Sequence, residues 1–235
     1  MQSEIDSIKL GVEEFLERLS GMAFAVVGSE ADKELCGVYS EELALLSPGA
    51  SARRERQFAL GRIAAHQALE KIGFSPSPSV LRSENREPLW PVGVVGSISH
   101  SDEFGVAVVA SSELFSSLGV DIQRLRSDTE LDVAKRVALK SESDWIFQGR
   151  TRADMCERLT LLFSAKESAF KLLYPLVKQF VGFRDVEFIW DEADRCFRGT
   201  LLKDFPDGLK SGEVVKIETA VVWPFVLTCG GASKR

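Results

Sequence analysis

The sequence has few of the residues that build metal clusters or disulfide frameworks. Its 235 residues include only four cysteines and two histidines. The cysteines lie far apart, with no CxxC pair, at Cys36, Cys156, Cys196 and Cys229. A structural zinc site or a disulfide scaffold is therefore not expected, and the thiols indicate a reducing compartment, the cytoplasm.

Long apolar runs and an excess of positive charge are also missing. No segment approaches the ~18 consecutive apolar residues of a membrane span, and the first residues are too acidic for a signal peptide. The formal net charge of −6 argues against a nucleic-acid-binding protein held by bulk charge, so an anion site must be built locally. With 45% hydrophobic and 27% charged residues, the composition is typical of a globular protein with a substantial core.

Two long amphipathic segments organise the chain. Residues 47–73 predict a helix that ends at Gly73, before a Pro/Ser-rich stretch, and a second helix covers residues 159–173 and ends near Pro175. Short apolar or alternating segments, typical of β-strands, follow each helix. The pattern predicts two similar α+β lobes that meet near Gly119.

Lys166 interrupts the apolar side of the second helix, because it lies four residues from both Leu162 and Phe170. A lysine is rarely buried without a partner, so Lys166 either extends its amine to water or meets an anion from another strand or a ligand. Glu167 and Lys171 have the i,i+4 spacing of an ion pair. By position alone this is a surface pair that stabilises the helix by a few tenths of a kcal/mol.

The first long helix carries two arginines near its apolar stripe. Arg54 and Arg62 lie one turn on either side of Phe58, and two guanidinium groups so placed would suit a phosphate, which arginine binds in a bidentate manner. The alternatives are an exposed Arg54 and an Arg62 that extends its charge to water. His100, just past a predicted strand, is more often a structural hydrogen-bonding residue; without Cys or His companions it is not a metal ligand, but it could donate to an anion.

The segment GVDIQ places two polar side chains on one side of a strand. Asp121 and Gln123 alternate with Val120 and Ile122, whose side faces the core. A carboxylate and an amide oxygen are hard ligands of the kind that Mg²⁺ accepts. The pattern alone is as often solvent-facing.

Taken in order, five segments resemble the Sfp-type 4′-phosphopantetheinyl transferases, in particular the subgroup of enterobactin synthase component D and its mycobacterial relatives. They are RRERQFALGRIAAHQAL, REPLWPVGVVGSISHS, LGVDIQ, LLFSAKESAFKLLYP and VGFRDVEF. The spacing of 46 residues from Asp121 to Glu167 makes the set specific. The resemblance implies a pseudo-twofold α+β fold of two lobes, residues 1–118 and 119–235, each a long helix on a small, mostly antiparallel sheet. The active site would lie in the cleft between them.

The resemblance also implies a reaction, in which the phosphopantetheine arm of coenzyme A moves to a serine of an apo acyl carrier protein or peptidyl carrier domain and 3′,5′-ADP is released. It implies Mg²⁺, or Mn²⁺, bound by Asp121, Gln123 and Glu167, although many relatives have glutamate where this chain has Gln123. Glu167 is our candidate for the general base. Siderophore synthesis, including enterobactin, or non-ribosomal peptide, polyketide or fatty-acid synthesis would use the product, and one chain with both lobes could act as a monomer.

Further residues are implied by the same resemblance. Contacts to coenzyme A fall on Arg54, Arg62, Arg82, Ser99, His100, Lys166 and Lys171. His100, Lys166 and Lys171 would supply positive charge in a partly dry cleft. On this interpretation Lys166 has no protein carboxylate that satisfies it when the ligand is absent.

Three other functions stay open on the residues alone. One is a non-catalytic member of the family that binds coenzyme A or a carrier protein, supported only by Gln123. Another is a Mg²⁺-dependent hydrolase that uses the same acidic residues. The least favoured is a nucleic-acid-binding module, since the chain lacks both net positive charge and interleaved aromatic and basic residues.

Overall fold

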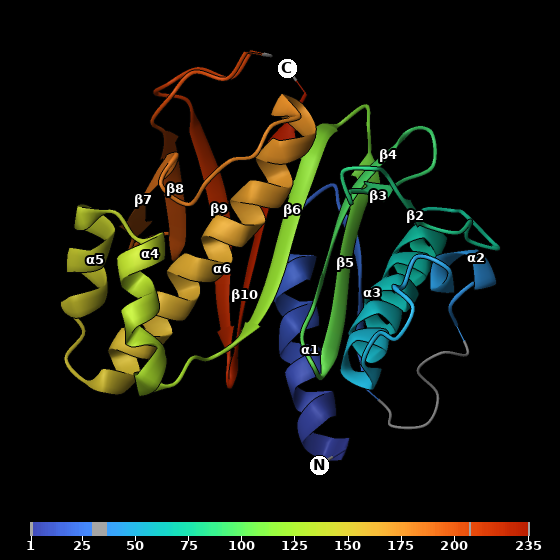
Figure 1. The fold of residues 1–235 in the computed structure, drawn as a ribbon, viewed down its shortest axis with the longest axis horizontal. Helices are drawn as coiled ribbons and strands as arrows, with labels where there is room; N and C mark the ends of the chain where they lie inside the picture. Colours follow the sequence, from blue (N-terminus) through green and yellow to red (C-terminus); the bar gives the residue numbers. More distant parts are fainter. Residues whose placement is uncertain (1, 30–36, 207, 235) are drawn as a thin grey trace.

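Two antiparallel sheets form the framework of the protein (Figure 1). The computed structural model describes residues 2–29, 37–206 and 208–234. The first sheet has the order β1-β5-β4, made of β1 (Ala23–Gly28), β5 (Phe104–Ser111) and β4 (Val94–His100). The second has the order β6-β10-β9-β8-β7, made of β6 (Phe115–Arg124), β10 (Phe225–Ser233), β9 (Val214–Val222), β8 (Cys196–Leu201) and β7 (Val186–Asp191). Two short strands, β2 (Leu81–Arg82) and β3 (Pro88–Leu89), pair as a separate hairpin.

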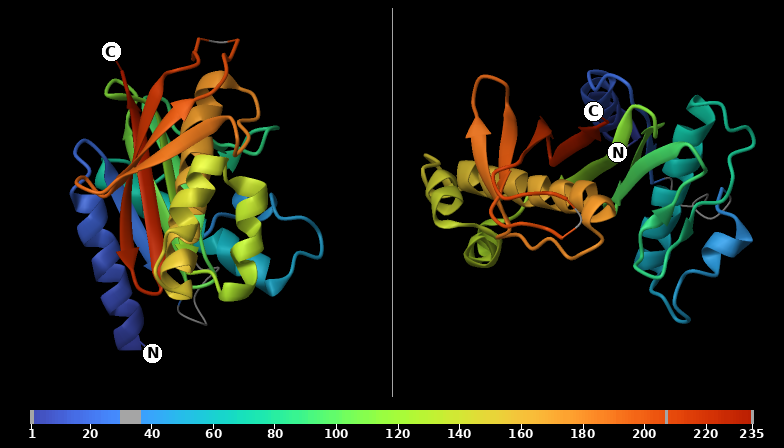
Figure 2. Two further views of the ribbon diagram at one scale, coloured as in Figure 1. Left: turned by 90° about the vertical axis from the view of Figure 1, so that its left-hand side faces the viewer. Right: turned by 90° about the horizontal axis from the view of Figure 1, so that it is seen from above.

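Each sheet carries one long helix, which confirms the predicted α+β class. α3 (Ala52–Lys71) packs on the first sheet and α6 (Arg152–Val177) on β6 and β10 of the second. In Figure 2, left, the strands lie between α6 on one side and α1 (Gln2–Glu17) on the other. The remaining short helices are α2 (Ser40–Leu43), η1 (Asp128–Val133), α4 (Ala134–Val137) and α5 (Lys140–Phe147). None of the helices in the described ranges is long and apolar enough to cross a membrane.

The strand β5 is buried on both of its faces. Val106 and Val108 pack with α1, whereas Ala107 and Val109 pack with the alanine-rich face of α3. Because successive side chains of a strand point to opposite faces, a strand buried on both faces reads as a continuous apolar run. The cluster beneath α1 also includes Val120 and further residues of β6 and β10, so the two predicted lobes share a core.

The two sheets meet at a seam between β4 and β6. Each of these strands is an edge strand of its sheet, and an unpaired edge leaves backbone N–H and C=O groups without partners. The hydroxyl of Ser97 accepts a hydrogen bond from the Val120 N–H (3.1 Å), and that of Ser99 accepts one from the Ile122 N–H (3.2 Å). These side chains take the place of backbone pairing across the seam. The predicted boundary at residue 118 falls inside β6, and the division into lobes stays a prediction.

Both long helices differ at their ends from the prediction. α6 begins earlier, at Arg152, because the Thr151 hydroxyl accepts a hydrogen bond from the Asp154 N–H and the Asp154 carboxylate caps the Thr151 N–H in return. It also continues past Pro175 to Val177, since a proline so close to the carboxyl end removes little of the hydrogen bonding. α3 begins at Ala52, after its cap Ser51, and not at residue 47.

The contact between α6 and β6 is unusually close. A Cβ atom added at Gly119 would lie 2.0 Å from the Ser168 carbonyl oxygen, so only glycine fits there. This approach brings the polar side chains of α6 against the face of β6 that bears Asp121.

Candidate active site

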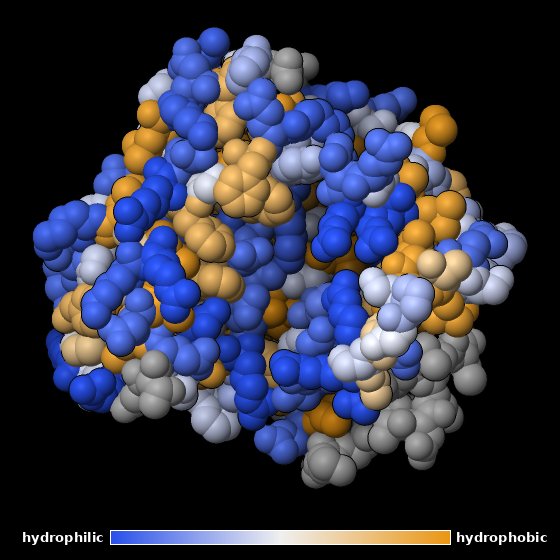
Figure 3. All heavy atoms as spheres, viewed as in Figure 1, coloured by the Kyte–Doolittle hydropathy of each residue, from blue (hydrophilic) through white to orange (hydrophobic). Residues whose placement is uncertain are grey.

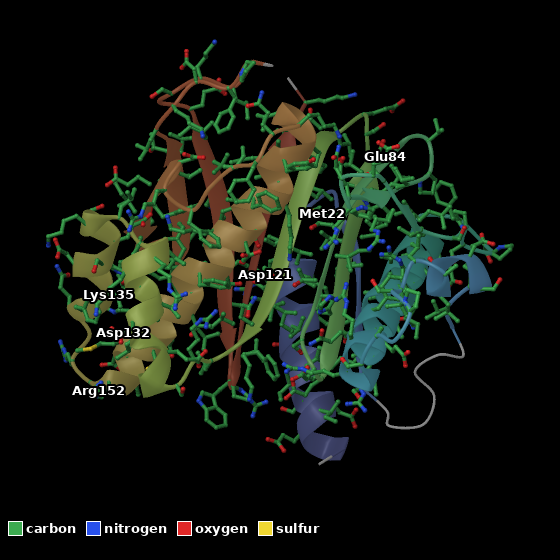
Figure 4. The ribbon with its side chains drawn as sticks, in the orientation of Figure 1. Met22, Glu84, Asp121, Asp132, Lys135 and Arg152 are labelled. Atoms are coloured by element: carbon green, nitrogen blue, oxygen red, sulfur yellow. The ribbon has the colours of Figure 1, made fainter. Side chains whose placement is uncertain are left out.

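Asp121 lies at the seam, between α6 and β6 (Figure 4). The residue is 2% exposed, and its carboxylate accepts four hydrogen bonds. Oδ1 accepts from Ser99 Oγ (2.8 Å) and from Lys171 Nζ (2.8 Å). Oδ2 accepts from Ser164 Oγ (2.9 Å) and from Gln123 Nε2 (3.0 Å). Donors from β4, β6 and α6 thus hold one carboxylate where the two sheets meet.

A buried row of hydroxyl groups stands behind Asp121. Ser164 Oγ lies 2.9 Å from Thr228 Oγ1, which lies 2.7 Å from Ser168 Oγ. All three residues are fully buried. Because Ser164 donates to Asp121, its oxygen accepts from Thr228 Oγ1, and the Ser168 hydroxyl donates to the Thr228 carbonyl oxygen (3.0 Å). Sequence reasoning assigned no role to these three residues, and the only signal for Thr228 is a hydroxyl inside an apolar strand.

Glu167 lies close to Asp121, although no hydrogen bond reaches its side chain within the described part of the chain. Burial and the negative charge of Asp121 raise the pKa of Glu167, while Lys171 and Arg126 act in the opposite direction. Two carboxylates that repel each other in a half-buried site form a donor set that fits a hard divalent cation. Asp121 and Glu167 could therefore hold Mg²⁺ or Mn²⁺.

Gln123 directs its amide nitrogen, and not its oxygen, towards Asp121. An amide oxygen turned to a carboxylate would be repelled, so the hydrogen bond fixes this orientation. The predicted role of Gln123 as a ligand through its oxygen is therefore not arranged in this structure.

A cleft of about 560 Å³ opens beside this cluster. Figure 3 shows the face hollowed between its two halves, with hydrophilic side chains along the hollow. The cationic and imidazole side chains that line it are Arg54, Arg62, Arg82, Arg86, His100, Lys171 and Lys178, and its aromatic side chains are Phe58, Trp90, Phe170 and Tyr174. The structure thus brings together all three of the predicted arginines with His100 and Lys171.

Lys171 connects the cleft to the carboxylate cluster. Its Nζ donates to the Val120 carbonyl oxygen (2.8 Å) and forms the 2.8 Å ion pair with Asp121. A quarter of the side chain is exposed, on the wall of the cleft. The predicted surface pair of Glu167 and Lys171 is therefore replaced by a pair between Lys171 and Asp121.

Arg62 is a buried cation whose ion pair with Glu42 is long. The residue is 7% exposed, Glu42 Oε1 is 3.9 Å from its Nε, and this Nε makes no hydrogen bond with the described residues. Its guanidinium lies over the Phe58 ring, 4.7 Å from the centroid. Burial, together with the charges of Arg82 and Arg54, lowers the pKa of Arg62 to about 10, against the attraction of Glu42. In this part of the cleft the positive charges of three arginines exceed the negative charge of Glu42, as expected of an anion site.

His100 is neutral in this setting, which corrects the expectation that it supplies positive charge. Burial, followed by the charges of Arg54 and Lys171, lowers the pKa of His100 to about 4. Arg54 Nη1 lies 3.1 Å from His100 Nε2, and a guanidinium can only donate. The ring proton therefore lies on Nδ1, which is buried and has no hydrogen-bond partner among the described residues.

The structure gives Arg82 and Ser99 different settings. Arg82 lines the cleft and donates from Nη2 to the Leu45 carbonyl oxygen (3.1 Å). Ser99 is buried, does not line the cleft, and has its hydroxyl bound between Asp121 and the Ile122 N–H. Its position suits orientation of Asp121 and not contact with a pyrophosphate.

The expectation that Lys166 lacks a protein carboxylate is wrong. Its Nζ lies 2.8 Å from Glu142 Oε1, and both side chains are buried. The same amine donates to the carbonyl oxygens of Phe183 and Val186. Burial lowers the pKa of Lys166, and Glu142 opposes this shift. Lys166 faces α5 and β7, away from the lining of the cleft, so the contact with a coenzyme A phosphate is withdrawn.

Comparisons with known proteins match both halves of the chain. Residues 41–110 match the family described as "4'-phosphopantetheinyl transferase N-terminal domain", and residues 117–222 match the "4'-phosphopantetheinyl transferase superfamily". The first match contains Arg54, Arg62 and Arg82, and the second contains Asp121 and Glu167.

Named relatives are similar over the same region. The 4′-phosphopantetheinyl transferase Svp of Streptomyces mobaraensis is 36% identical over 154 residues, which are 66% of this chain and 62% of the relative. The 4′-phosphopantetheinyl transferase PptT of Mycobacterium tuberculosis is 32% identical over 155 residues, 63% of each chain. Enterobactin synthase component D of Escherichia coli O157:H7 is 34% identical over 145 residues, 61% of this chain and 66% of the relative. The matched region spans just under two thirds of the length of each of these proteins.

Proposed function

Because the chain belongs to the 4′-phosphopantetheinyl transferase superfamily, we propose that it transfers the 4′-phosphopantetheine arm of coenzyme A to a serine of an apo acyl carrier protein or peptidyl carrier domain. The other product is 3′,5′-ADP. One observation carries the proposal: Lys171 joins the Asp121 carboxylate to a cleft lined by arginines. That arrangement suits a ligand with several phosphates, one of which reacts beside the carboxylates.

The charges of the cleft support coenzyme A as the donor of the arm. Arg62 is buried, its pair with Glu42 is long at 3.9 Å, and Arg54 and Arg82 lie close enough to lower its pKa. A 3′-phosphate would relieve this repulsion, since guanidinium groups bind phosphate in a bidentate manner. The pyrophosphate would then lie towards Lys171 and the free Nδ1–H of His100.

Asp121 and Glu167 would hold the divalent cation, Mg²⁺ or Mn²⁺. Their mutual repulsion, expressed in the raised pKa of Glu167, would be relieved by a positive charge between them. When bound, the cation supplies neutralising charge to the pyrophosphate oxygens.

The chain's own residues then serve an in-line phosphoryl transfer. The serine oxygen of the carrier attacks the phosphorus nearest the pantetheine, and the bond from this phosphorus to the bridging oxygen breaks. That oxygen leaves with the electron pair as part of 3′,5′-ADP. Lys171 and His100 donate hydrogen bonds to the charged oxygens. Glu167, the carboxylate beside Asp121, takes the serine proton as the general base.

Intact-mass measurement of a carrier protein tests the proposal. An apo carrier incubated with the chain, coenzyme A and Mg²⁺ should gain the mass of one phosphopantetheine arm. If none of several acyl and peptidyl carriers gains this mass, the proposal is refuted.

Two variants test the carboxylates in the same assay. Asp121→Ala and Glu167→Ala should each lower the rate by orders of magnitude while remaining folded, because each removes a charge from the reacting centre. The matched control is Asp102→Ala, which removes a carboxylate bound to Arg53 and Gln57 outside the cleft, and its rate should stay near that of the wild type. Retained turnover in either of the first two variants would refute the metal assignment.

The setting of this activity is proposed with it. Siderophore, non-ribosomal peptide, polyketide or fatty-acid synthesis would consume the modified carrier, and similarity to proteins named enterobactin synthase component D favours the first. We further propose a cytoplasmic monomer, since both walls of the cleft come from one chain.

A further inference from the structure

The acceptor capacity of Asp121 is full. A carboxylate offers about four lone-pair positions, and Asp121 receives four donors, two on each oxygen. A cation at this carboxylate needs one of those positions. At least one donor must therefore withdraw before Asp121 can bind a metal ion.

Three of the four donors are held by further hydrogen bonds. The Ser99 hydroxyl also accepts from the Ile122 N–H. Ser164 is tied to the buried hydroxyl of Thr228. Lys171 also donates to a backbone carbonyl oxygen, so it would give up an ion pair and part of its anchorage by leaving. Withdrawal of Ser99 or Ser164 would strand a buried hydroxyl group, and withdrawal of Lys171 would break an ion pair.

Gln123 is held by its single bond to Asp121. Among the described residues, its side chain makes no other hydrogen bond, and it is half-buried at the end of β6 nearest solvent-exposed Arg124. Its amide can turn to water without leaving an unpaired group. Of the four donors, it costs least to displace.

We infer that Gln123 is an exchangeable cap on Asp121, a positioning residue that competes with the cation for Oδ2 and so sets the metal affinity of the site. Its amide N–H, the positive end of a neutral dipole, occupies in the free protein a position that the cation takes on binding. This inference rests on the proposed function, which places the cation at Asp121. It assigns Gln123 the opposite effect from that of a ligand, because a cap weakens metal binding and a ligand strengthens it.

Direct Mn²⁺ binding distinguishes the two roles. Free Mn²⁺ is measured by electron paramagnetic resonance during titration of the full chain, with neither coenzyme A nor carrier present. Gln123→Leu removes the competing donor and should bind Mn²⁺ roughly threefold to tenfold more tightly, the equivalent of one net hydrogen bond. Gln57→Leu is the matched control, since Gln57 Nε2 donates to Asp102 in the same way (2.8 Å) but outside the cleft. Its Mn²⁺ affinity should equal that of the wild type.

The outcomes separate clearly. Weaker Mn²⁺ binding by Gln123→Leu would show that Gln123 is a ligand, and unchanged affinity would show that it does not compete; either result overturns the inference. Asp121→Asn should abolish binding, and if it does not, the ion lies elsewhere and the inference also fails. Failure of the proposed function has a different signature, since the carrier would then gain no mass whatever the Mn²⁺ affinity of the variants.

Discussion

The pair formed by Lys166 and Glu142 yields the sharpest prediction about stability. Lys166 is 3% exposed and Glu142 is 1% exposed. The Glu142 carboxylate also accepts hydrogen bonds from the Phe188 N–H (2.8 Å) and the Leu139 N–H (2.6 Å). The pair therefore ties the start of α5 to α6 and to β7.

Lys166→Met should lower the free energy of unfolding by about 3–5 kcal/mol, because it leaves a buried carboxylate without its cation. It also removes the donor to the carbonyl oxygens of Phe183 and Val186. Urea denaturation followed by circular dichroism measures the loss. The double variant Lys166→Met/Glu142→Gln should recover about 1–2 kcal/mol, since the unpaired charge is gone.

Lys140→Met is the matched control for this prediction. Lys140 pairs with Asp144 at i,i+4 spacing, and its side chain is 85% exposed. Its loss should change the free energy of unfolding by less than about 0.5 kcal/mol. A Lys166→Met protein within about 1 kcal/mol of wild type, but with weakened binding of coenzyme A, would refute the structural role and restore the phosphate contact.

Two further predictions concern the cleft. Arg62→Met should weaken coenzyme A binding by roughly tenfold or more in calorimetric titration, because a charge-assisted hydrogen bond is lost. The control Arg53→Met removes an exposed arginine paired with Asp102 and should leave the affinity for coenzyme A unchanged. Equal affinities of the two variants would contradict the anion site. Folding lowers the pKa of His100 to about 4, so the unfolded chain binds a proton at this residue more readily than the folded chain. The contribution of neutral His100 to the free energy of unfolding is therefore complete above about pH 6.5 and is lost as the pH falls towards 4. The unfolding free energy of wild type should therefore fall more steeply over that window than that of His100→Gln, and parallel curves would refute the shift.

The sequence predicts the presence of the two long helices better than the residues at which they begin and end. Hydrophobic periodicity places both long helices, because a face buried against a sheet must be apolar. The start of α6 was missed, since its first turns are polar and its beginning depends on the reciprocal cap between Thr151 and Asp154. Its end was placed at residue 173, four residues early, because Pro175 was read as a stop, although a proline there removes only one hydrogen bond near the end of the helix.

The site shows where local patterns stop being informative. Alternation correctly separates Asp121 from Val120 and Ile122, but it does not reveal that α6 covers the polar side of β6 and buries the carboxylate. The partner of Lys166 is a residue of another helix, Glu142, and no local spacing identifies such a pairing. Lys171 likewise pairs with Asp121 and not with Glu167 on its own helix, because the close contact at Gly119 brings α6 against β6.

The most direct test of the proposed activity measures both products of one reaction. The chain is incubated with coenzyme A, Mg²⁺ and an apo carrier, and 3′,5′-ADP is quantified by chromatography beside the modified carrier by mass spectrometry. The account predicts equal amounts of the two products, with no 3′,5′-ADP formed when the carrier is omitted. Release of 3′,5′-ADP or phosphate from coenzyme A without a carrier would identify a hydrolase, and binding of coenzyme A with neither product would identify a non-catalytic protein. Either result would contradict the transfer that we assign to this cleft.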